Sequence, residues 1–236
     1  MSKDPVTLLR HRAGVRVLHG INALAVIVLL VTGLALGEVL ASGWVALLGG
    51  HLRVNAIHRG LGLAFAVAWL LIVCVQPRRI GRLLRDTLRF QCGDGRWFVE
   101  FPRFCLTPRR WPAPFHAGRF DPAQRVVFLL LVVAVVVVSL TGVYMYWEPR
   151  WGRLMFVLMI RAHIVAAWTL IGCLCLHVAA GCGLLPSHRG LVTAMFGDGR
   201  VRLTRAQALW PGWAARQTAG EPPRHEAKRS KVDRRR

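Results

Sequence analysis

Four stretches of the chain consist almost entirely of apolar residues. They cover residues 17–37, 57–76, 126–147 and 162–185. At a rise of ~1.5 Å per residue, helices of this length cross the hydrocarbon core of a bilayer. Residues 126–140 are almost purely Val and Leu, and a soluble domain of this size could not bury four such segments. The pattern predicts an all-α integral membrane protein in which four spans form a helix bundle.

Composition agrees with this class, and charge orients the spans. Of the 236 residues, 54% are hydrophobic and only 18% are charged, with a net charge of +21. All but five of the 32 Lys and Arg residues lie before the first span, between the second and third, or after the fourth. The positive-inside rule therefore predicts that both termini and the central loop are cytoplasmic. We expect the first span to be retained, because it lacks the cleavage site of a signal peptide.

The segments outside the spans are expected to be less regular. Several prolines between residues 77 and 125 favour an irregular cytoplasmic loop. We expect a cytoplasmic amphipathic segment over residues 186–221 and a basic disordered tail over 222–236. The tail has the charge to touch anionic lipid or nucleic acid, but a solvated tail is the simpler interpretation. No nucleic-acid partner is therefore expected.

Four histidines lie in or at the ends of the spans, where ionisable side chains are costly and commonly functional. His19 and His58 stand at the starts of the first and second spans, and His163 and His177 lie in the fourth. The predicted topology places His58 and His163 near the outer face and His19 and His177 near the inner face. Since His163 and His177 are 14 residues apart, they project from one helix face, ~21 Å apart along the axis.

Two histidines at each depth predict two haem sites. A non-covalent b-type haem in a helix bundle takes one neutral imidazole on each side of its iron. We therefore predict that His58 and His163 bind an outer haem and that His19 and His177 bind an inner one. Gly33, 14 residues after His19, would leave room for the outer porphyrin on the same helix face.

Charged groups at the ends of the spans are candidates for haem propionates. Arg16 would serve on the inner side, and Arg59 and Arg161 on the outer side. Snorkelling of each arginine to the membrane interface is an equally good interpretation. The remaining histidines are expected to be ordinary exposed residues: His11, His51, His116, His188 and His225.

These residues resemble those of prokaryotic di-haem cytochrome b membrane subunits, most closely the gamma subunit of respiratory formate dehydrogenase. The resemblance covers residues 12–185. It rests on Arg16-Val-Leu-His19 with Thr32-Gly33, on His58-Arg59-Gly60, on residues 120–125 with Thr141-Gly142, and on the spacing of His163 and His177. The histidine set is shared with cytochrome b subunits of nickel-iron hydrogenases and of thiosulfate-reductase-type enzymes.

The resemblance implies that the protein lies in the bacterial inner membrane and that other chains supply the electrons. A periplasmic catalytic dehydrogenase subunit and an iron-sulfur subunit would reduce the outer haem. The inner haem would then pass electrons to menaquinone or ubiquinone near the cytoplasmic face. The family's quinone pocket corresponds here to Asp121, Ala123 and Gln124, beside the inner ligand His177. The chain would not oxidise formate by itself.

Other interpretations stay open on the sequence alone. The electron donor is a hydrogenase or a thiosulfate reductase in one alternative. In another, the protein is a haem-free membrane anchor or transporter, with histidines that pack or relay protons. Asp121 has two interpretations, as a proton donor to quinone and as a helix N-cap, because Asp121-Pro122 is typical of a helix start.

Overall fold

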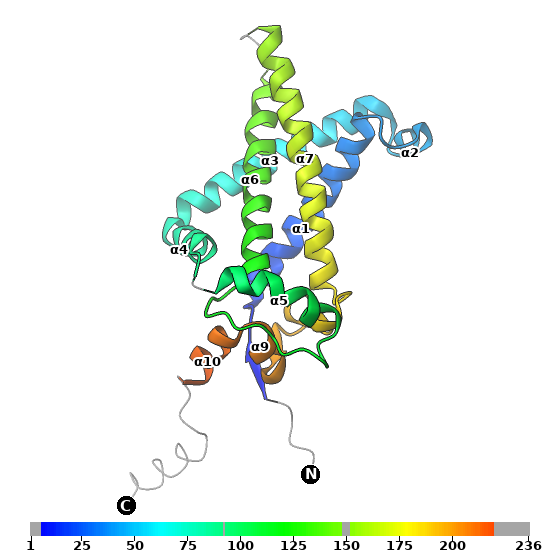
Figure 1. The fold of residues 1–236 in the computed structure, drawn as a ribbon. Coiled ribbons are helices and arrows are strands. Elements are labelled where there is room, and N and C mark those ends of the chain that lie inside the picture. Colours follow the sequence, from blue (N-terminus) through cyan, green and yellow to red (C-terminus); the bar gives the residue numbers. More distant parts are fainter. Residues whose placement is uncertain (1–5, 92, 148–151, 220–236) are drawn as a thin grey trace, which may run out of the picture. The chain divides into compact units, whose positions relative to one another are not determined.

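The computed structural model describes residues 6–91, 93–147 and 152–219, which are mostly helical. The elements are, in chain order, β1 (Thr7–Leu9), α1 (Ala13–Leu36), α2 (Ser42–Leu47), α3 (Gly50–Val75), α4 (Pro77–Leu88), α5 (Asp94–Leu106), α6 (Pro122–Tyr146), α7 (Arg153–Gly181), η1 (Pro186–His188), α8 (Val192–Phe196), β2 (Arg200–Arg202), α9 (Leu203–Leu209) and α10 (Pro211–Ala219) (Figure 1). They form two compact units. One spans Ala13–Leu88 and Val126–Ala179, and the other, which we name the smaller unit, contains the remaining segments.

Four helices are long and apolar enough to cross a membrane, as predicted: α1, α3, α6 and α7. All four begin earlier than the apolar runs do, and the difference is largest for α3 and α7. α3 starts at Gly50 and α7 at Arg153, because Arg53 and Arg161 interrupt the run of hydrophobic residues without interrupting the helix. The chain is thus a multi-pass membrane protein with an all-α bundle.

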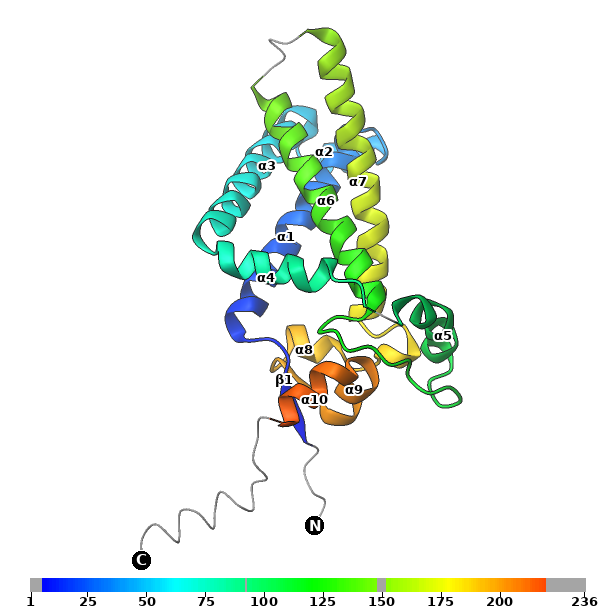
Figure 2. The ribbon, with the colours of Figure 1, turned by 60° about the vertical axis from the view of Figure 1, so that its left-hand side comes forward.

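The four spans share one core. Val26 of α1, Ala134 of α6 and Leu170 of α7 are buried together, and Phe65 of α3 packs against them. Figures 1 and 2 both show α6 and α7 running side by side. Many other apolar side chains of these helices are exposed, such as Leu24 with 65% of its surface accessible. That outward-facing surface is the one expected to contact lipid.

The central loop is more ordered than predicted. The prediction of an irregular segment over 77–125 is wrong at α4 and at α5, which is preceded by Gly93 in the left-handed conformation (φ 99°). Pro77 is compatible with α4 because it occupies the first position of the helix, where no backbone donor is needed. Pro102 lies inside α5, which forms in spite of it. The apolar residues of α5 supply the reason for its folding, since Trp97 and Phe104 are buried.

The smaller unit has its own aromatic core. Phe104 of α5 packs with Trp210 and Trp213, which flank the start of α10. β1 pairs antiparallel with β2, with Leu8 opposite Val201. Residues 186–219 therefore form short helices and a strand around a core, a more compact arrangement than the predicted amphipathic segment. The predicted tail over 222–236 lies outside the described residues.

A buried ion pair stabilises this unit. Arg125, near the start of α6, lies 2.6 Å from a carboxylate oxygen of Asp94, and both side chains are about 95% buried. Asp94 also accepts a hydrogen bond from the backbone of Gln91, and Arg125 donates to the carbonyl of Arg89. Each charge thus has one further hydrogen bond besides the ion pair, which offsets part of the cost of burying it.

Candidate haem sites

The structure brings the four span histidines together in two pairs. His58 of α3 and His163 of α7, which we name the outer pair, have ring centres 6.2 Å apart and planes 75° apart. His19 of α1 and His177 of α7, the inner pair, have ring centres 6.1 Å apart and planes 41° apart. These are the two pairs that depth along the spans predicted.

Both separations suit two imidazoles on opposite sides of one metal ion. An imidazole nitrogen binds a first-row metal at roughly 2 Å and lies about 1 Å from its ring centre, so two such rings have centres about 6 Å apart. The observed 6.1 and 6.2 Å match that requirement. Direct stacking or a hydrogen bond between the rings would bring them closer. Each pair of imidazoles could therefore hold a b-type haem between its two rings.

Threonines fix the orientation of the outer pair. The Thr32 hydroxyl donates to the carbonyl of Val28 at 2.7 Å, so its oxygen accepts from Nδ1–H of His58 at 2.9 Å. Thr141 likewise donates to its own helix and accepts from Nδ1–H of His163 at 2.9 Å. A neutral imidazole with its hydrogen on Nδ1 has its lone pair on Nε2. Both rings are therefore held in the form that binds iron.

The residue after each threonine is a glycine that lies against the same ring. A Cβ on Gly33 would stand 3.2 Å from Cε1 of His58, and one on Gly142 would stand 3.5 Å from Cε1 of His163. The Thr32-Gly33 and Thr141-Gly142 pairs thus perform the same two tasks on two helices: the hydroxyl orients the imidazole and the glycine leaves space for it. Gly33 faces the outer pair, at the level that its spacing from His19 predicted.

The predicted propionate arginines have different surroundings. Arg59 donates to the carbonyl of Tyr146 at 3.0 Å and lies over the Tyr146 ring, so it contacts the C-terminal end of α6. Arg161 is exposed on α7. Arg16 lies in the first turns of α1, before His19. A role for any of them in binding a propionate stays a prediction.

Sequence reasoning did not assign roles to the residues that support the histidines. Thr32 and Thr141 are buried at 3% and 5% exposure, and their role depends on which helix faces the histidine. Trp69 of α3 also donates to the side chain of Asn22 on α1 at 3.0 Å. A polar residue inside a span, such as Asn22, is the available sequence signal for such a contact.

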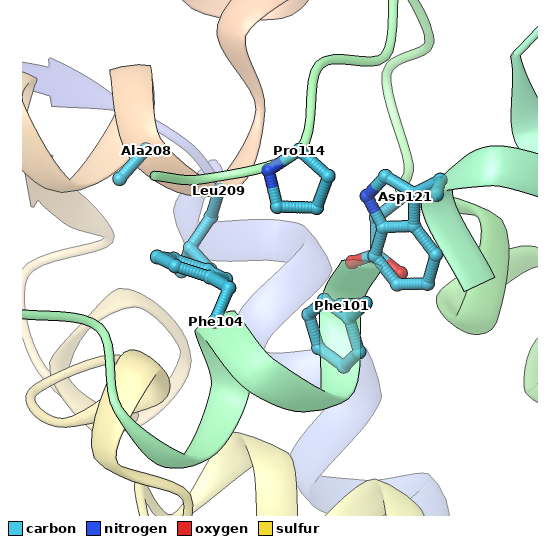
Figure 3. Close-up of a pocket in the computed structure, with 7 residues that line it drawn as sticks. Phe101, Phe104, Pro114, Asp121, Ala208 and Leu209 are labelled. Atoms are coloured by element: carbon cyan, nitrogen blue, oxygen red, sulfur yellow. The ribbon is translucent and has the colours of Figure 1, made fainter. Parts of the chain in front are cut away.

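The predicted quinone segment lies at the start of α6, in the smaller unit. Asp121 caps the helix, because its Oδ1 accepts from the backbone N–H of Gln124 at 2.8 Å, as one of its two interpretations predicted. The Gln124 side chain accepts from the indole of Trp210. Asp121 borders a small recess with Phe101, Phe104, Pro114 and other apolar residues (Figure 3). Burial raises the pKa of Asp121 to about 6, so this carboxyl exchanges its proton near neutral pH.

Two histidines outside the spans are buried, contrary to prediction. His116 and His188 are only 4% and 3% exposed. His116 Nε2 bonds to the carbonyl of Leu209 at 2.8 Å, and His188 Nδ1 bonds to the Ser187 hydroxyl at 2.8 Å. Burial lowers the pKa of His188 to about 4 and also lowers that of His116. They were assigned to the surface because nothing local in the sequence indicates the aromatic core that covers them.

Comparison with known families covers most of the chain. A family model described as prokaryotic cytochrome b561 matches residues 10–198. The matched region contains all four spans and both histidine pairs. No curated protein matches the chain.

Proposed function

Since the chain belongs to the prokaryotic cytochrome b561 family and is therefore a membrane cytochrome b for electron transfer, we propose that it joins a periplasmic formate dehydrogenase to the quinone pool. Its outer pair would hold one b-type haem and its inner pair a second. Electrons would enter at the outer site, cross the membrane to the inner site and reduce a quinone near the cytoplasmic face.

The observation that carries this proposal is the spacing of the two imidazole pairs. Each pair joins α7 to a different helix, with ring centres about 6 Å apart. A b-type haem held by two imidazoles supplies reversible one-electron transfer. The chain orients His58 and His163 through Thr32 and Thr141.

The arrangement along α7 supports a path across the bilayer. His163 and His177 lie on one helix, ~21 Å apart by helical rise. Two sites at these depths are separated by most of the hydrocarbon thickness. Electrons that move inward and meet protons taken up from the cytoplasm would generate membrane potential.

For the quinone we propose the segment Asp121, Ala123 and Gln124, as the family resemblance implies. Quinone reduction consumes two protons with two electrons, and a carboxyl whose pKa is about 6 is suited to deliver them at neutral pH. We expect Asp121→Asn to slow quinone reduction while haem reduction by the donor persists. Asparagine is also an effective N-cap, so this variant removes the proton and keeps the helix start. Asp121→Ala, which removes the proton and also the N-cap, serves as the comparison variant. Equal loss of haem reduction and quinone reduction in Asp121→Asn would contradict the assignment.

A difference spectrum of membranes that contain the protein and its native partners tests the proposal. Formate under anaerobic conditions is expected to give b-type bands close to the amplitude that dithionite gives. His58→Ala or His163→Ala should remove the bands of the outer haem from the spectrum and leave those of the inner haem. The absence of any band with the chain present would contradict haem binding by these histidines.

The same spectrum distinguishes the donors. Bands with dithionite and hydrogen, but not with formate, would assign the chain to a hydrogenase. Reduction through a sulfur-compound couple would assign it to a thiosulfate-reductase-type complex. In either case the histidine pairs keep their role and the periplasmic partner changes.

A further inference from the structure

Helix α4 separates its charged and apolar side chains. At 3.6 residues per turn, four of its arginines fall within one ~120° arc. These exposed residues are Arg78, Arg79, Arg82 and Arg85. The opposite side carries Ile80, Leu83 and Leu84, which are half-buried. Such a division is typical of helices at the boundary between lipid and water, whose basic side chains face the headgroups.

The junction of α3 and α4 is hollowed. An open space of about 480 Å³ is lined by the end of α3 and the first turns of α4, and Figure 2 shows α4 turning away from α3 there. Its lining residues are Cys74, Val75, Gln76, Pro77, Arg78, Arg79 and Arg82. Arg79 donates to the Gln76 side chain at 2.7 Å, which holds its guanidinium at the junction.

The charge of this hollow suits a phosphate group. Arg78, Arg79 and Arg82 contribute three positive charges, and none of the seven lining residues is acidic. Guanidinium groups bind phosphate oxygens through paired, charge-assisted hydrogen bonds. Three exposed guanidinium groups at one junction therefore form a place where a phosphate can bind.

An apolar stripe on α3 leads into the same hollow. Val67, Leu71 and Val75 are four residues apart, so they lie along one face of the helix. Their exposed fractions are 46, 57 and 75%, and Val75 itself lines the hollow. A free phosphate ion would use the arginines alone, whereas a molecule with a phosphate and acyl chains would contact both.

We propose that the junction of α3 and α4 binds an anionic phospholipid, with its phosphate against Arg78, Arg79 and Arg82 and an acyl chain along Val67, Leu71 and Val75. The lipid would fasten α4 to the membrane surface. The charge and the apolar stripe belong to this chain's own residues, so the site does not depend on the identity of the electron donor.

Native mass spectrometry of the full chain, purified from vesicles of phosphatidylcholine and phosphatidylglycerol, tests this. Wild-type protein should retain phosphatidylglycerol in preference to phosphatidylcholine. The triple variant Arg78→Gln, Arg79→Gln and Arg82→Gln should weaken this retention on the order of a hundredfold, about fivefold for each arginine. The matched control removes three exposed arginines of the other unit, Arg109→Gln, Arg110→Gln and Arg189→Gln, and should retain lipid as wild type does.

Two further arms make the outcome decisive. Leu71→Asn should reduce retention of phosphatidylglycerol although it keeps every arginine, and inorganic phosphate at millimolar concentration should not displace the lipid. If phosphate displaces it, or if Leu71→Asn has no effect, the site takes a free anion and the proposal is wrong. Equal retention by the triple variant and its control would also overturn it. Should the triple variant fail to fold, Arg82→Gln alone should show the roughly fivefold loss.

Discussion

The hydrogen bond between Thr32 and His58 offers a direct test of how the outer site is built. Thr32→Val keeps the shape of the side chain and removes the oxygen that accepts from Nδ1–H of His58 at 2.9 Å. Because Thr32 is 3% exposed, water cannot easily replace the lost acceptor. A buried donor without a partner costs about 1–3 kcal/mol. We therefore expect the affinity of the outer site for haem to fall between about fivefold and about a hundredfold.

The same substitution should change the reduction potential of the outer haem. The Nδ1–H group is more acidic when the bound iron is oxidised, so the hydrogen bond stabilises the oxidised state more than the reduced state. If loss of the hydrogen bond destabilises the oxidised state by about 1 kcal/mol more than the reduced state, the reduction potential rises by about 40 mV. For one electron, 59 mV corresponds to a tenfold change in the equilibrium constant. A redox titration of the b-type bands in membranes measures this shift.

The chain provides matched controls for that titration. The Thr169 hydroxyl on α7 bonds only to the Val165 carbonyl of its own helix among the contacts seen, so Thr169→Val should leave both potentials unchanged. Thr32→Ser retains the hydroxyl and should restore the wild-type value. The reduction potential of the inner haem should be unchanged in every variant. An unchanged outer potential in Thr32→Val, or an equal shift of both components, would refute the argument.

Three further predictions concern packing, charge and pH. Gly33→Ala should lower occupancy of the outer haem more than Gly142→Ala, because the added Cβ would stand 3.2 Å rather than 3.5 Å from the facing imidazole; equal pyridine haemochrome yields would contradict this. Asp94→Asn should destabilise the smaller unit by about 3–5 kcal/mol, because it leaves the Arg125 charge buried and unpaired; Asp94→Leu combined with Arg125→Met should recover most of the loss in a thermal melt, and no recovery would argue against the charge as the cause. The pKa of His188 is lowered to about 4 in the folded protein, so the unfolded chain binds a proton at this residue more readily. The stability of the smaller unit should therefore fall by up to about 3 kcal/mol as pH drops from about 6.5 toward 4. Hydrogen exchange in the smaller unit measures this loss, and His188→Gln should make its stability less dependent on pH.

The spans and the pairing of their histidines could be predicted because both follow from one-dimensional rules. Span length depends on the run of apolar residues, and depth depends on rise per residue. His163 and His177 therefore fixed two levels, and His19 and His58 could be matched to them. The predicted starts of α3 and α7 were late because a hydropathy run ends at an arginine, while a helix continues through it.

What the sequence could not supply is the rotation of one helix against another. Thr32 supports His58 only because α1 turns that face toward α3, and no local pattern encodes this. The buried state of His116 and His188 has the same origin, since their cover comes from Trp97, Phe101 and other residues far along the chain. The arginines of α4 were counted as loop charge because their helical spacing was outweighed by nearby prolines.

The Thr-Gly support of each outer histidine bears on how the protein is made. α1 supplies the support for His58 on α3, and α6 supplies it for His163 on α7. Each ligand therefore acquires its orientation within its own pair of consecutive spans. Because membrane chains are synthesised from the N-terminus, we expect Thr32 to orient His58 before α6 and α7 are inserted. Insertion of α6 and α7 then adds His163, oriented by Thr141, and completes the outer pair.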